Sequence, residues 1–389
     1  MSKTYNKTYK TIETRLVHSG QPHPRISGAV ATPIFQSATF EYENQASYHD
    51  IRYIRLNNTP NHEVLHLKLA AAENGEAAVV TASGMAAITT ALFAVLRPGD
   101  HLLAQSCLYG GTHDFVTQYL KDFGVSYSFI DAADPDSWKS RLQPKTRALY
   151  VETMSNPLLQ VPDLRAAVKF GKAHGLVSMI DNTFATPVNF RPLDLGFDLA
   201  LHSCTKYMNG HSDIVAGACI GSATLVEQIK HKLDHLGGSL DPHAAFLLER
   251  GLKTMALRVR CQNTNALQIA RFFSEHDQVA SVNYPGLESH PQHKIASSLF
   301  TGFGGMLSLE LKGGHHAAES FINKTEIAIN APSLGGVETL VTRPASTSHA
   351  GMSPEDRRKL GISDGLIRIS VGIEGTDDLI QDFSKALEG

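Results

Sequence analysis

Short apolar runs and amphipathic patterns alternate along the chain from about residue 62 to residue 222. The apolar runs are typical of buried strands, and apolar residues spaced three or four positions apart are typical of helices. The predicted strands span residues 77–82, 101–106, 125–131, 147–154, 176–181, 199–204 and 217–222. The predicted helices span residues 84–96, 111–124 and 163–175. This alternation predicts an α/β fold with a mostly parallel, doubly wound sheet and helices on both of its faces.

The pattern changes on either side of this region. Beyond residue 251, a long helical pattern over 254–276 is followed by strand patterns at 306–311 and 366–374 and a closing helix over 376–389, which predicts a smaller α+β domain. Residues 1–60 show no regular alternation and predict an arm. We therefore expect an arm over residues 1–60, a large domain over 61–250 and a small domain over 251–389.

Charge and cysteine content narrow the classes of partner. Residues 77–96 form an uncharged run long enough for a membrane span. Thr81, Ser83 and Gly84 interrupt it, so a strand, a turn and a helix explain it better, and we expect no membrane partner. The net charge is −3 without a basic stripe, which argues against nucleic acid. Four scattered cysteines and no apolar signal segment predict a reduced, cytoplasmic protein.

Two ionisable residues follow predicted strands of the large sheet. Lys206 lies among small hydroxyl residues where a strand ends, and partial burial would lower its pKa and favour Schiff-base chemistry. A lysine at the sheet surface remains the alternative. Asp181 ends another strand, where it could hold the pyridine nitrogen of pyridoxal phosphate in its protonated form. A turn or helix cap is the alternative for Asp181.

Residues suited to binding a phosphate lie at the ends of other predicted strands. Ser83, Gly84 and Met85 connect a strand to a helix, and backbone N–H groups at a helix start bind anions. Ser203 and Thr205 alternate along the strand before Lys206, so their hydroxyls are predicted to share one face and to bind the same phosphate. Tyr109 follows another strand and could stack on the cofactor ring.

Four segments together resemble one enzyme family. "TASGMAAI", "IDNTFATP", "HSCTKYMNGHSD" and "SLGGVETL" occur in this order and resemble the Cys/Met-metabolism enzymes that use pyridoxal phosphate. That family includes cystathionine γ-synthases, cystathionine β- and γ-lyases and methionine γ-lyases. The resemblance runs from about Thr14 to Leu387. It implies an aspartate-aminotransferase-like fold of type I, and residues 61–250 as the domain that binds pyridoxal phosphate.

The resemblance also implies roles for individual residues. Lys206 binds the cofactor covalently and transfers protons, Asp181 pairs with the pyridine nitrogen, and Tyr109 stacks on the ring and takes part in catalysis. The implied phosphate ligands are Ser83, Gly84, Met85, Ser203 and Thr205. The residues implied to contact the amino-acid substrate are Asn156, Ser333, Leu334 and Arg368. An arginine suits the substrate α-carboxylate because its guanidinium binds a carboxylate with two hydrogen bonds.

The arm contains a further motif of this family. Tyr53 and Arg55 resemble a Tyr-x-Arg that reaches the phosphate site of a neighbouring subunit, which implies at least a dimer and usually a homotetramer. The chain departs from the family pattern just beyond, where Asn58, Thr59 and Pro60 replace Asn-Pro-Thr. Thr59 is still suited to cap a helix that begins at Pro60.

A zinc peptidase is a competing hypothesis from a different class. His62, Glu63 and His66 match H-E-x-x-H, which on a helix places both histidines on one face. The match lacks an identifiable third ligand, and 19 histidines make chance matches common. We therefore expect no catalytic metal, and we expect His315 and His316 to be surface residues.

One position bears on the reaction within the family. A glutamate often precedes Ser-Leu-Gly-Gly in cystathionine γ-synthases and γ-lyases, whereas Pro332 precedes Ser333 in this chain. Without an acidic side chain to receive the distal ammonium of cystathionine, the sequence favours cystathionine β-lyase. Other segments resemble γ-synthases, so γ-replacement on an activated homoserine and γ-elimination from cystathionine or methionine remain open.

Overall fold

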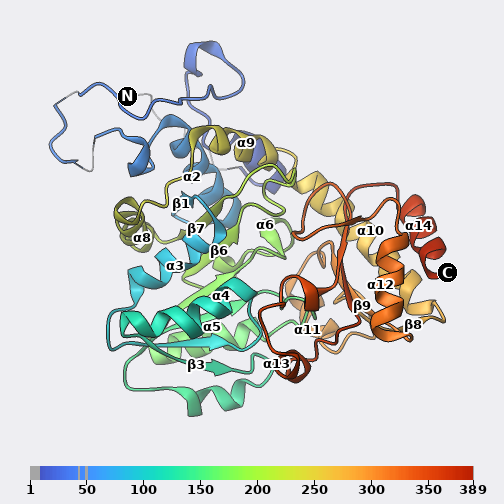
Figure 1. Cartoon of the computed structure of the whole chain (residues 1–389). Coiled ribbons are helices and arrows are strands. Elements are labelled where there is room, and N and C mark those ends of the chain that lie inside the picture. The colour runs from blue at the N-terminus through green and yellow to red at the C-terminus, as the bar shows by residue number, and fades with distance from the viewer. Residues whose placement is uncertain (1–8, 43, 49–50, 389) are drawn as a thin grey trace.

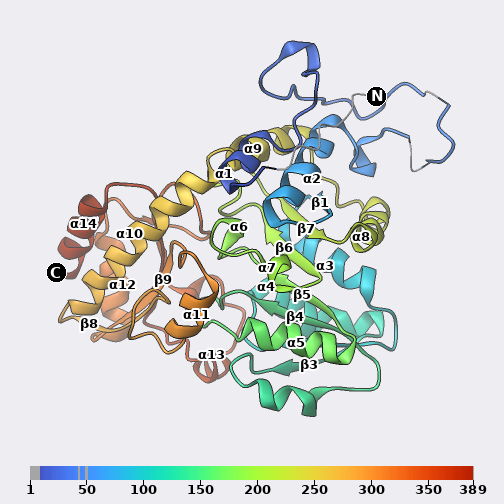
Figure 2. The ribbon, with the colours of Figure 1, turned by 180° about the vertical axis from the view of Figure 1, so that it is seen from behind.

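The computed structural model describes residues 9–42, 44–48 and 51–388. Two sheets organise the chain, and Figures 1 and 2 show them side by side with helices packed around each. The first eight residues of the predicted arm and its positions 43, 49 and 50 lie outside the described residues.

The larger sheet has seven strands in the order β1-β7-β6-β5-β4-β2-β3. Its strands are β1 (Ala77–Thr81), β2 (His101–Gln105), β3 (Ser126–Ile130), β4 (Thr146–Glu152), β5 (Val177–Asp181), β6 (Leu199–Ser203) and β7 (Gly217–Gly221). Strands β3, β2, β4, β5 and β6 are parallel, and β7 runs antiparallel to both β6 and β1. All seven predicted strands are therefore present, and the predicted mostly parallel α/β sheet is confirmed.

Helices cover both faces of this sheet. One face packs on α3, α4 and α8, and the other on α2 and α5, with side chains of each strand alternating between the two cores. The helices are α2 (Pro60–Glu73), α3 (Gly84–Val95), α4 (Gly110–Asp114), α5 (Leu164–His174), α6 (Thr186–Asn189), α7 (Pro192–Leu195), α8 (Ala223–Leu236) and α9 (Pro242–Leu252). Side chains of Ser83, Asp163, Ser222 and Asp241 cap α3, α5, α8 and α9.

The second sheet has five strands in the order β10-β11-β12-β9-β8, antiparallel except for the β10–β11 pair. Its strands are β8 (Val279–Asn283), β9 (Met306–Leu311), β10 (Ile329–Asn330), β11 (Leu340–Thr342) and β12 (Leu366–Ser370). The helices of this half are α10 (Met255–Glu275), α11 (His293–Leu299), α12 (Gly314–Lys324), α13 (Pro354–Lys359) and α14 (Thr376–Glu388). Helices α10, α12 and α14 pack together, as both views show.

One helix was not predicted from the sequence, and one predicted helix was wrong. The predicted arm contains a helix, α1 (Ile12–His18), which packs against α2 because Leu16 is buried in the core there. The segment 111–124, predicted as one helix, consists of α4, a π-helical turn over Phe115–Tyr119 and a 3₁₀ turn over Leu120–Phe123. After α1, the arm extends away from the body of the molecule in both views. The three domain boundaries stay a prediction.

None of the helices in the described part of the chain combines the length and the apolar character that a membrane crossing requires. Residues 77–96 form strand β1 and helix α3, as the interrupted pattern predicted.

Candidate active site

A cavity of about 870 Å³ lies where several strands of the large sheet end at their carboxyl edge. The small half of the molecule closes it with segments around residues 332–334, 347–351 and 368. Twelve of the fourteen site residues predicted from the sequence line this one cavity: Ser83, Gly84, Met85, Tyr109, Asn156, Asp181, Ser203, Thr205, Lys206, Ser333, Leu334 and Arg368.

Lys206 lies in the turn that follows β6, and its side chain points into the cavity wall shared with the small half. Its Nζ donates a hydrogen bond to Ser333 Oγ at 2.8 Å. Burial, together with the nearby positive charge of Arg368, lowers the pKa of Lys206 to about 8. A substantial fraction of this amine is therefore neutral, and hence nucleophilic, near neutral pH.

The start of α3 forms the part of the cavity suited to an anion. Ser83 Oγ accepts the N–H of Ala86 at 3.0 Å, while the first N–H groups of a helix lack acceptors within the helix itself. A Cβ on Gly84 would lie 2.8 Å from Ser203 Cβ, so only glycine lets the helix start approach β6 this closely. The Ser203 hydroxyl therefore lies beside the first turn of α3.

One step of the reasoning about Ser203 and Thr205 was wrong. Strand β6 ends at Ser203, and Thr205 lies in the following turn rather than two residues along the same strand. The Thr205 hydroxyl donates to the carbonyl oxygen of Ala216 at 3.2 Å and accepts the N–H of Ala216 at 3.0 Å. Both residues still line the cavity, because the turn folds back toward β7.

Asp181 and Glu152 end the adjacent parallel strands β5 and β4 and lie opposite each other in the register. Both line the cavity, and both are carboxylic acids in a buried environment. Burial raises the pKa of Asp181, opposed by hydrogen bonds from Thr183 and by the charge of His202. Burial and the neighbouring Asp181 raise the pKa of Glu152 well above its ordinary value. Both carboxyls therefore hold a proton more readily than an exposed carboxyl does, and the hydrogen bonds from Thr183 favour the ionised form of Asp181.

Tyr109 lies beside this pair at the mouth of the cavity. Its backbone N–H donates to Glu152 Oε1 at 2.7 Å, and its side chain is 45% exposed. Because Tyr109 lines the cavity and is nearly half exposed, its side chain is accessible to a ligand there.

Arg368 on β12 forms the opposite wall. It is almost fully buried, and burial lowers its pKa to about 10. Its Nη1 donates to Asn156 Oδ1 at 3.3 Å and its Nη2 to the carbonyl oxygen of Ser333 at 3.0 Å. Among the described residues its buried Nε has no hydrogen-bond partner. A buried guanidinium with no carboxylate beside it lacks a compensating negative charge and an acceptor for its Nε–H. A carboxylate from a ligand would supply both.

Sequence reasoning missed several residues of the cavity wall. These include Glu152, Thr183, Thr347, Ser348 and Asp114. Glu152 ends an apolar strand just as Asp181 does, and applying the strand-end rule to it would have found it. The expectation that an acidic side chain is missing near the substrate holds at Pro332 but not for the whole cavity, because Asp114 and Glu152 also line it.

Tyr53 and Arg55 are the two predicted site residues outside this cavity. Arg55 contacts the carbonyl oxygen of Asp234, and its Nη2 lies 2.5 Å from the Tyr48 hydroxyl, whereas the cavity is lined by other segments. Thr59 caps α2 and Pro60 is its first residue, as the sequence predicted.

The H-E-x-x-H segment has the wrong geometry for a zinc site. His62 Nδ1 lies 2.8 Å from Thr59 Oγ1 and its Nε2 lies 2.7 Å from the carbonyl oxygen of Leu240, so both ring nitrogens are engaged. Burial lowers the pKa of His62 to about 4. Glu63 is on the surface, where it forms an ion pair with Arg52 at 2.9 Å. These contacts hold the start of α2 in place.

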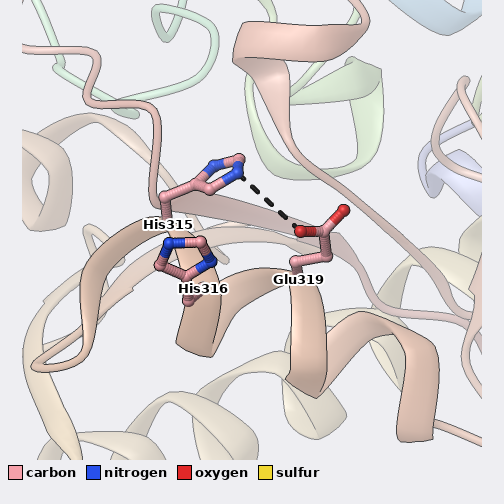
Figure 3. Close-up of side chains that lie close together, drawn as sticks. All are labelled: His315, His316 and Glu319. Atoms are coloured by element: carbon pink, nitrogen blue, oxygen red, sulfur yellow. Dashed lines mark ion pairs between the residues drawn. The ribbon is translucent and has the colours of Figure 1, made fainter.

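One other group of possible metal ligands lies within the part of the chain that the structure describes. His315, His316 and Glu319 project from α12 with their ligand atoms within 4.8 Å of one another, as Figure 3 shows. All three are exposed, as predicted for the histidines. The Arg343 guanidinium contacts the ring of His315 and lies 3.9 Å from Glu319, so a cation is already present at this cluster.

The residues of the cavity fit pyridoxal phosphate. The helix start with Ser83, Gly84 and Ser203 suits its phosphate, Asp181 suits its ring nitrogen, and Lys206 suits its aldehyde. The volume accommodates the cofactor with an amino acid beside it. The unpartnered Nε of Arg368 lies in the wall where that amino acid would place its carboxylate.

Comparison with known proteins gives a consistent result. A family model described as "Cys/Met metabolism PLP-dependent enzyme" matches residues 13–388. The chain is 40% identical over 388 residues to a cystathionine β-lyase of Coxiella burnetii, covering 99% of this chain and 100% of that protein. It is 40% identical over 388 residues to an L-methionine γ-lyase of Pseudomonas putida, covering 96% of each. The structure of a cystathionine γ-lyase from Lactobacillus plantarum complexed with L-serine superimposes with a TM-score of 0.92 at 36% identity, covering 97% of this chain and 99% of the other.

Proposed function

The chain belongs to the Cys/Met-metabolism enzymes that depend on pyridoxal phosphate, and we propose that it is a cystathionine β-lyase. The reaction converts cystathionine and water to homocysteine, pyruvate and ammonia. The aspartate-aminotransferase-like fold of type I and the lyase class follow from the family and its solved structures. The substrate is the part of this assignment that we propose.

We assign a role to each cavity residue that was predicted from the sequence. Bound pyridoxal phosphate supplies an electron sink for the pair left at the substrate Cα when its proton is removed. Lys206 takes the Cα proton, and its lowered pKa supports that role. Arg368 and Asn156 bind the substrate α-carboxylate, with Ser333 and Leu334 beside them. Asp181 pairs with the ring nitrogen and Tyr109 stacks on the ring. Ser83, Gly84, Met85, Ser203 and Thr205 bind the phosphate.

The observation that carries the choice of substrate is the wall formed by Pro332. It lines the cavity beside Ser333, the partner of Lys206, and presents an apolar ring near the reacting atoms. At this position no carboxylate can bind the distal ammonium of cystathionine, and none can accept a proton removed from its Cβ. This favours elimination in which the sulfur leaves directly from Cβ. A γ-elimination remains the second candidate, since an L-methionine γ-lyase is equally similar to this chain.

The oligomer and the compartment are further parts of the proposal. We propose a homotetramer in which Tyr53 and Arg55 of one subunit complete the phosphate site of its neighbour, supported by the fact that neither residue lines the cavity of its own chain. We propose a cytoplasmic location, supported by four cysteines that form no disulfide.

The keto acid released from cystathionine tests the reaction. Purified holoenzyme is incubated with cystathionine alone, and the product is identified by chromatography. Pyruvate with homocysteine is expected. Release of 2-oxobutyrate with cysteine would assign γ-elimination instead, and turnover only when an activated homoserine ester and cysteine are supplied would assign γ-replacement. A Lys206→Ala variant is the control, because its loss of turnover ties the product to this cavity.

A further inference from the structure

A buried polar cluster lies behind the active site, on the opposite face of the large sheet. Glu73, the last residue of α2, places its Oε1 2.6 Å from His202 Nε2 and 2.9 Å from Asn182 Nδ2. All three side chains are almost completely buried. Asn182 Nδ2 also donates to the carbonyl oxygen of Phe190, and Asn182 Oδ1 accepts from the Thr153 hydroxyl. The proposed chemistry uses none of these residues.

The position of this cluster along the chain is what makes it informative. Asn182 directly follows Asp181 at the end of β5, and His202 directly precedes Ser203 at the end of β6. Side chains alternate between the two faces of a strand, so Asp181 and Ser203 face the cavity while Asn182 and His202 face α2. A single carboxylate oxygen of Glu73 thus joins the ends of two neighbouring strands from behind.

Few other hydrogen bonds join the ends of β5 and β6 among the described residues. The register of β5 and β6 ends with Asp181 opposite Leu201, and the N–H of Asn182 donates to the carbonyl oxygen of Leu201 at 2.9 Å. On the cavity face, the N–H of Ser203 donates to Thr183 Oγ1 at 2.8 Å. Glu73 supplies the link on the other face, through a short bond that is charge-assisted when the imidazole is protonated.

We propose that Glu73 is a positioning residue for pyridoxal phosphate: by holding Asn182 and His202 together, it fixes the spacing between Asp181 and Ser203, and hence between the ring-nitrogen and phosphate ends of the cofactor site. The inference rests on the proposed roles of Asp181 and Ser203. His202 also affects the cofactor site electrostatically. Burial raises the pKa of Asp181, and the charge of His202 counteracts part of that rise. Glu73 itself touches neither cofactor nor substrate.

The test compares cofactor affinity and cofactor spectrum in variants of the full chain. Apo-protein is titrated with pyridoxal phosphate, and the dissociation constant and the absorption maximum of the bound form are recorded. Glu73→Ala is expected to weaken affinity by at least about tenfold and to shift the absorption maximum, because two buried donors lose their acceptor. Glu73→Gln keeps an oxygen that accepts both bonds, and is expected to restore affinity to within about threefold of the original chain.

A matched control separates positioning from general stability. Glu249 on α9 is equally buried and bonded, to Gln21 and Lys253, but lies outside the cavity and its neighbours. Glu249→Ala is expected to lower the unfolding temperature while leaving cofactor affinity and spectrum unchanged. If it weakens cofactor binding as much as Glu73→Ala does, the proposed role of Glu73 is wrong.

Three further variants keep the inference testable even if Glu73→Ala fails to fold. Glu73→Asp retains the charge but withdraws the carboxylate by one methylene, so it is expected to weaken affinity. Unchanged affinity and spectrum in this variant would overturn the inference. Asp181→Ala and Ser203→Ala test the roles on which it depends: if they leave cofactor binding intact, the proposed site roles fail. If they weaken binding while every Glu73 variant binds normally, only the inference about Glu73 fails.

Discussion

At the scale of single residues, the active site is built from charged groups that burial has altered. Burial and the nearby Arg368 lower the pKa of Lys206, whereas burial and the neighbouring Asp181 raise the pKa of Glu152. These two shifts have opposite signs, since burial favours the uncharged form of either a base or an acid. The cavity therefore favours the uncharged forms of both its amine and its buried carboxyl groups.

The lowered pKa of Lys206 predicts how uptake of the cofactor depends on pH. Only the neutral amine attacks an aldehyde, and its fraction rises as pH rises through the pKa. The rate of covalent uptake of pyridoxal phosphate by apo-protein is therefore expected to rise up to a pH of about 8 and then level off. Stopped-flow absorbance measures this rate. A rate that still rises nearly tenfold between about pH 8 and about pH 9 would show an ordinary lysine.

The buried guanidinium of Arg368 predicts a defect in substrate binding. Arg368→Lys keeps a positive charge but loses the planar pair of donors, and Arg368→Ala loses both. Loss of a charge-assisted pair costs about 2 kcal/mol, so Arg368→Ala is expected to raise KM by about 30-fold and to lower kcat much less. Steady-state kinetics measure both. Arg343→Ala, on the surface of the same half, is the control, and an unchanged KM for Arg368→Ala would contradict the assignment.

Sequence reasoning found the residues whose chemistry is unusual for their position. Lys206 and Asp181 could be predicted because each follows an apolar strand, and parallel sheets place their chemistry at the carboxyl ends of strands; Arg368 could be predicted only through the family resemblance. Glu73 and His202 were not identifiable. Glu73 occurs at the end of a helix and His202 inside a strand, and nothing in their spacing of 129 residues indicates that they meet. Their bond depends on how α2 packs on the sheet.

At the scale of elements, a helix start and a strand end approach closely at the proposed phosphate site. Helix α3 begins against β6, and the missing side chain of Gly84 sets the separation. Gly217 on β7 has a similar effect on the other side, because a Cβ there would lie 2.3 Å from the carbonyl oxygen of Ser83. The two glycines allow three elements to meet where we propose that the phosphate binds.

A substitution at Gly84 tests this arrangement. Gly84→Ala is expected to displace the first turn of α3 and to weaken cofactor binding by about tenfold, since overpacking of this kind costs about 1–3 kcal/mol. Titration of apo-protein with pyridoxal phosphate measures the effect. Gly171→Ala in α5 is the matched control: its Cβ would meet ordinary contacts at 3.4 Å, and the alanine is expected to stabilise the helix by up to about 1 kcal/mol. Equal cofactor affinity in the two variants would contradict the role of Gly84.

Most strands of the large sheet were predictable because they are short apolar runs, and β3 because its polar and apolar residues alternate. The order of the strands and the reversed direction of β7 were not, since they depend on connections that leave no local pattern. The short strands β10 and β11 were missed because two or three residues are too few to show a period. Helix α1 was missed because only Leu16 of its seven residues is buried.

At the scale of the whole molecule, Tyr53 and Arg55 do not line the cavity of their own chain, and Arg55 instead contacts the carbonyl oxygen of Asp234 on α8. On this ground we propose a site shared between neighbouring subunits. In such an oligomer, a defect in Arg55 would disable the neighbour's cavity, whereas a defect in Lys206 would disable its own.

Mixing two inactive variants tests this sharing. Hybrid dimers of Lys206→Ala and Arg55→Ala chains are expected to contain one intact cavity, so random mixing restores about a quarter of the original activity. Activity after refolding the mixed chains measures the recovery. Lys206→Ala mixed with Asp181→Ala is the control, because both residues belong to the same cavity and no hybrid is intact. Recovery no greater than the sum of the two parents would show that Arg55 does not act across subunits.

The two walls of the cavity divide recognition between the two halves of the chain. Residues from the large sheet surround the proposed cofactor position, whereas Pro332, Ser333 and Arg368 come from the other half and lie on the side proposed for the amino acid. Substitution of Pro332 is therefore expected to alter which sulfur compound reacts while leaving the bound coenzyme undisturbed, whereas substitution of Ser333 also removes the hydrogen-bond partner of Lys206. Such independence gives a physical route by which one ancestral scaffold diversified into catalysts for different thioethers, as the names of this chain's relatives illustrate.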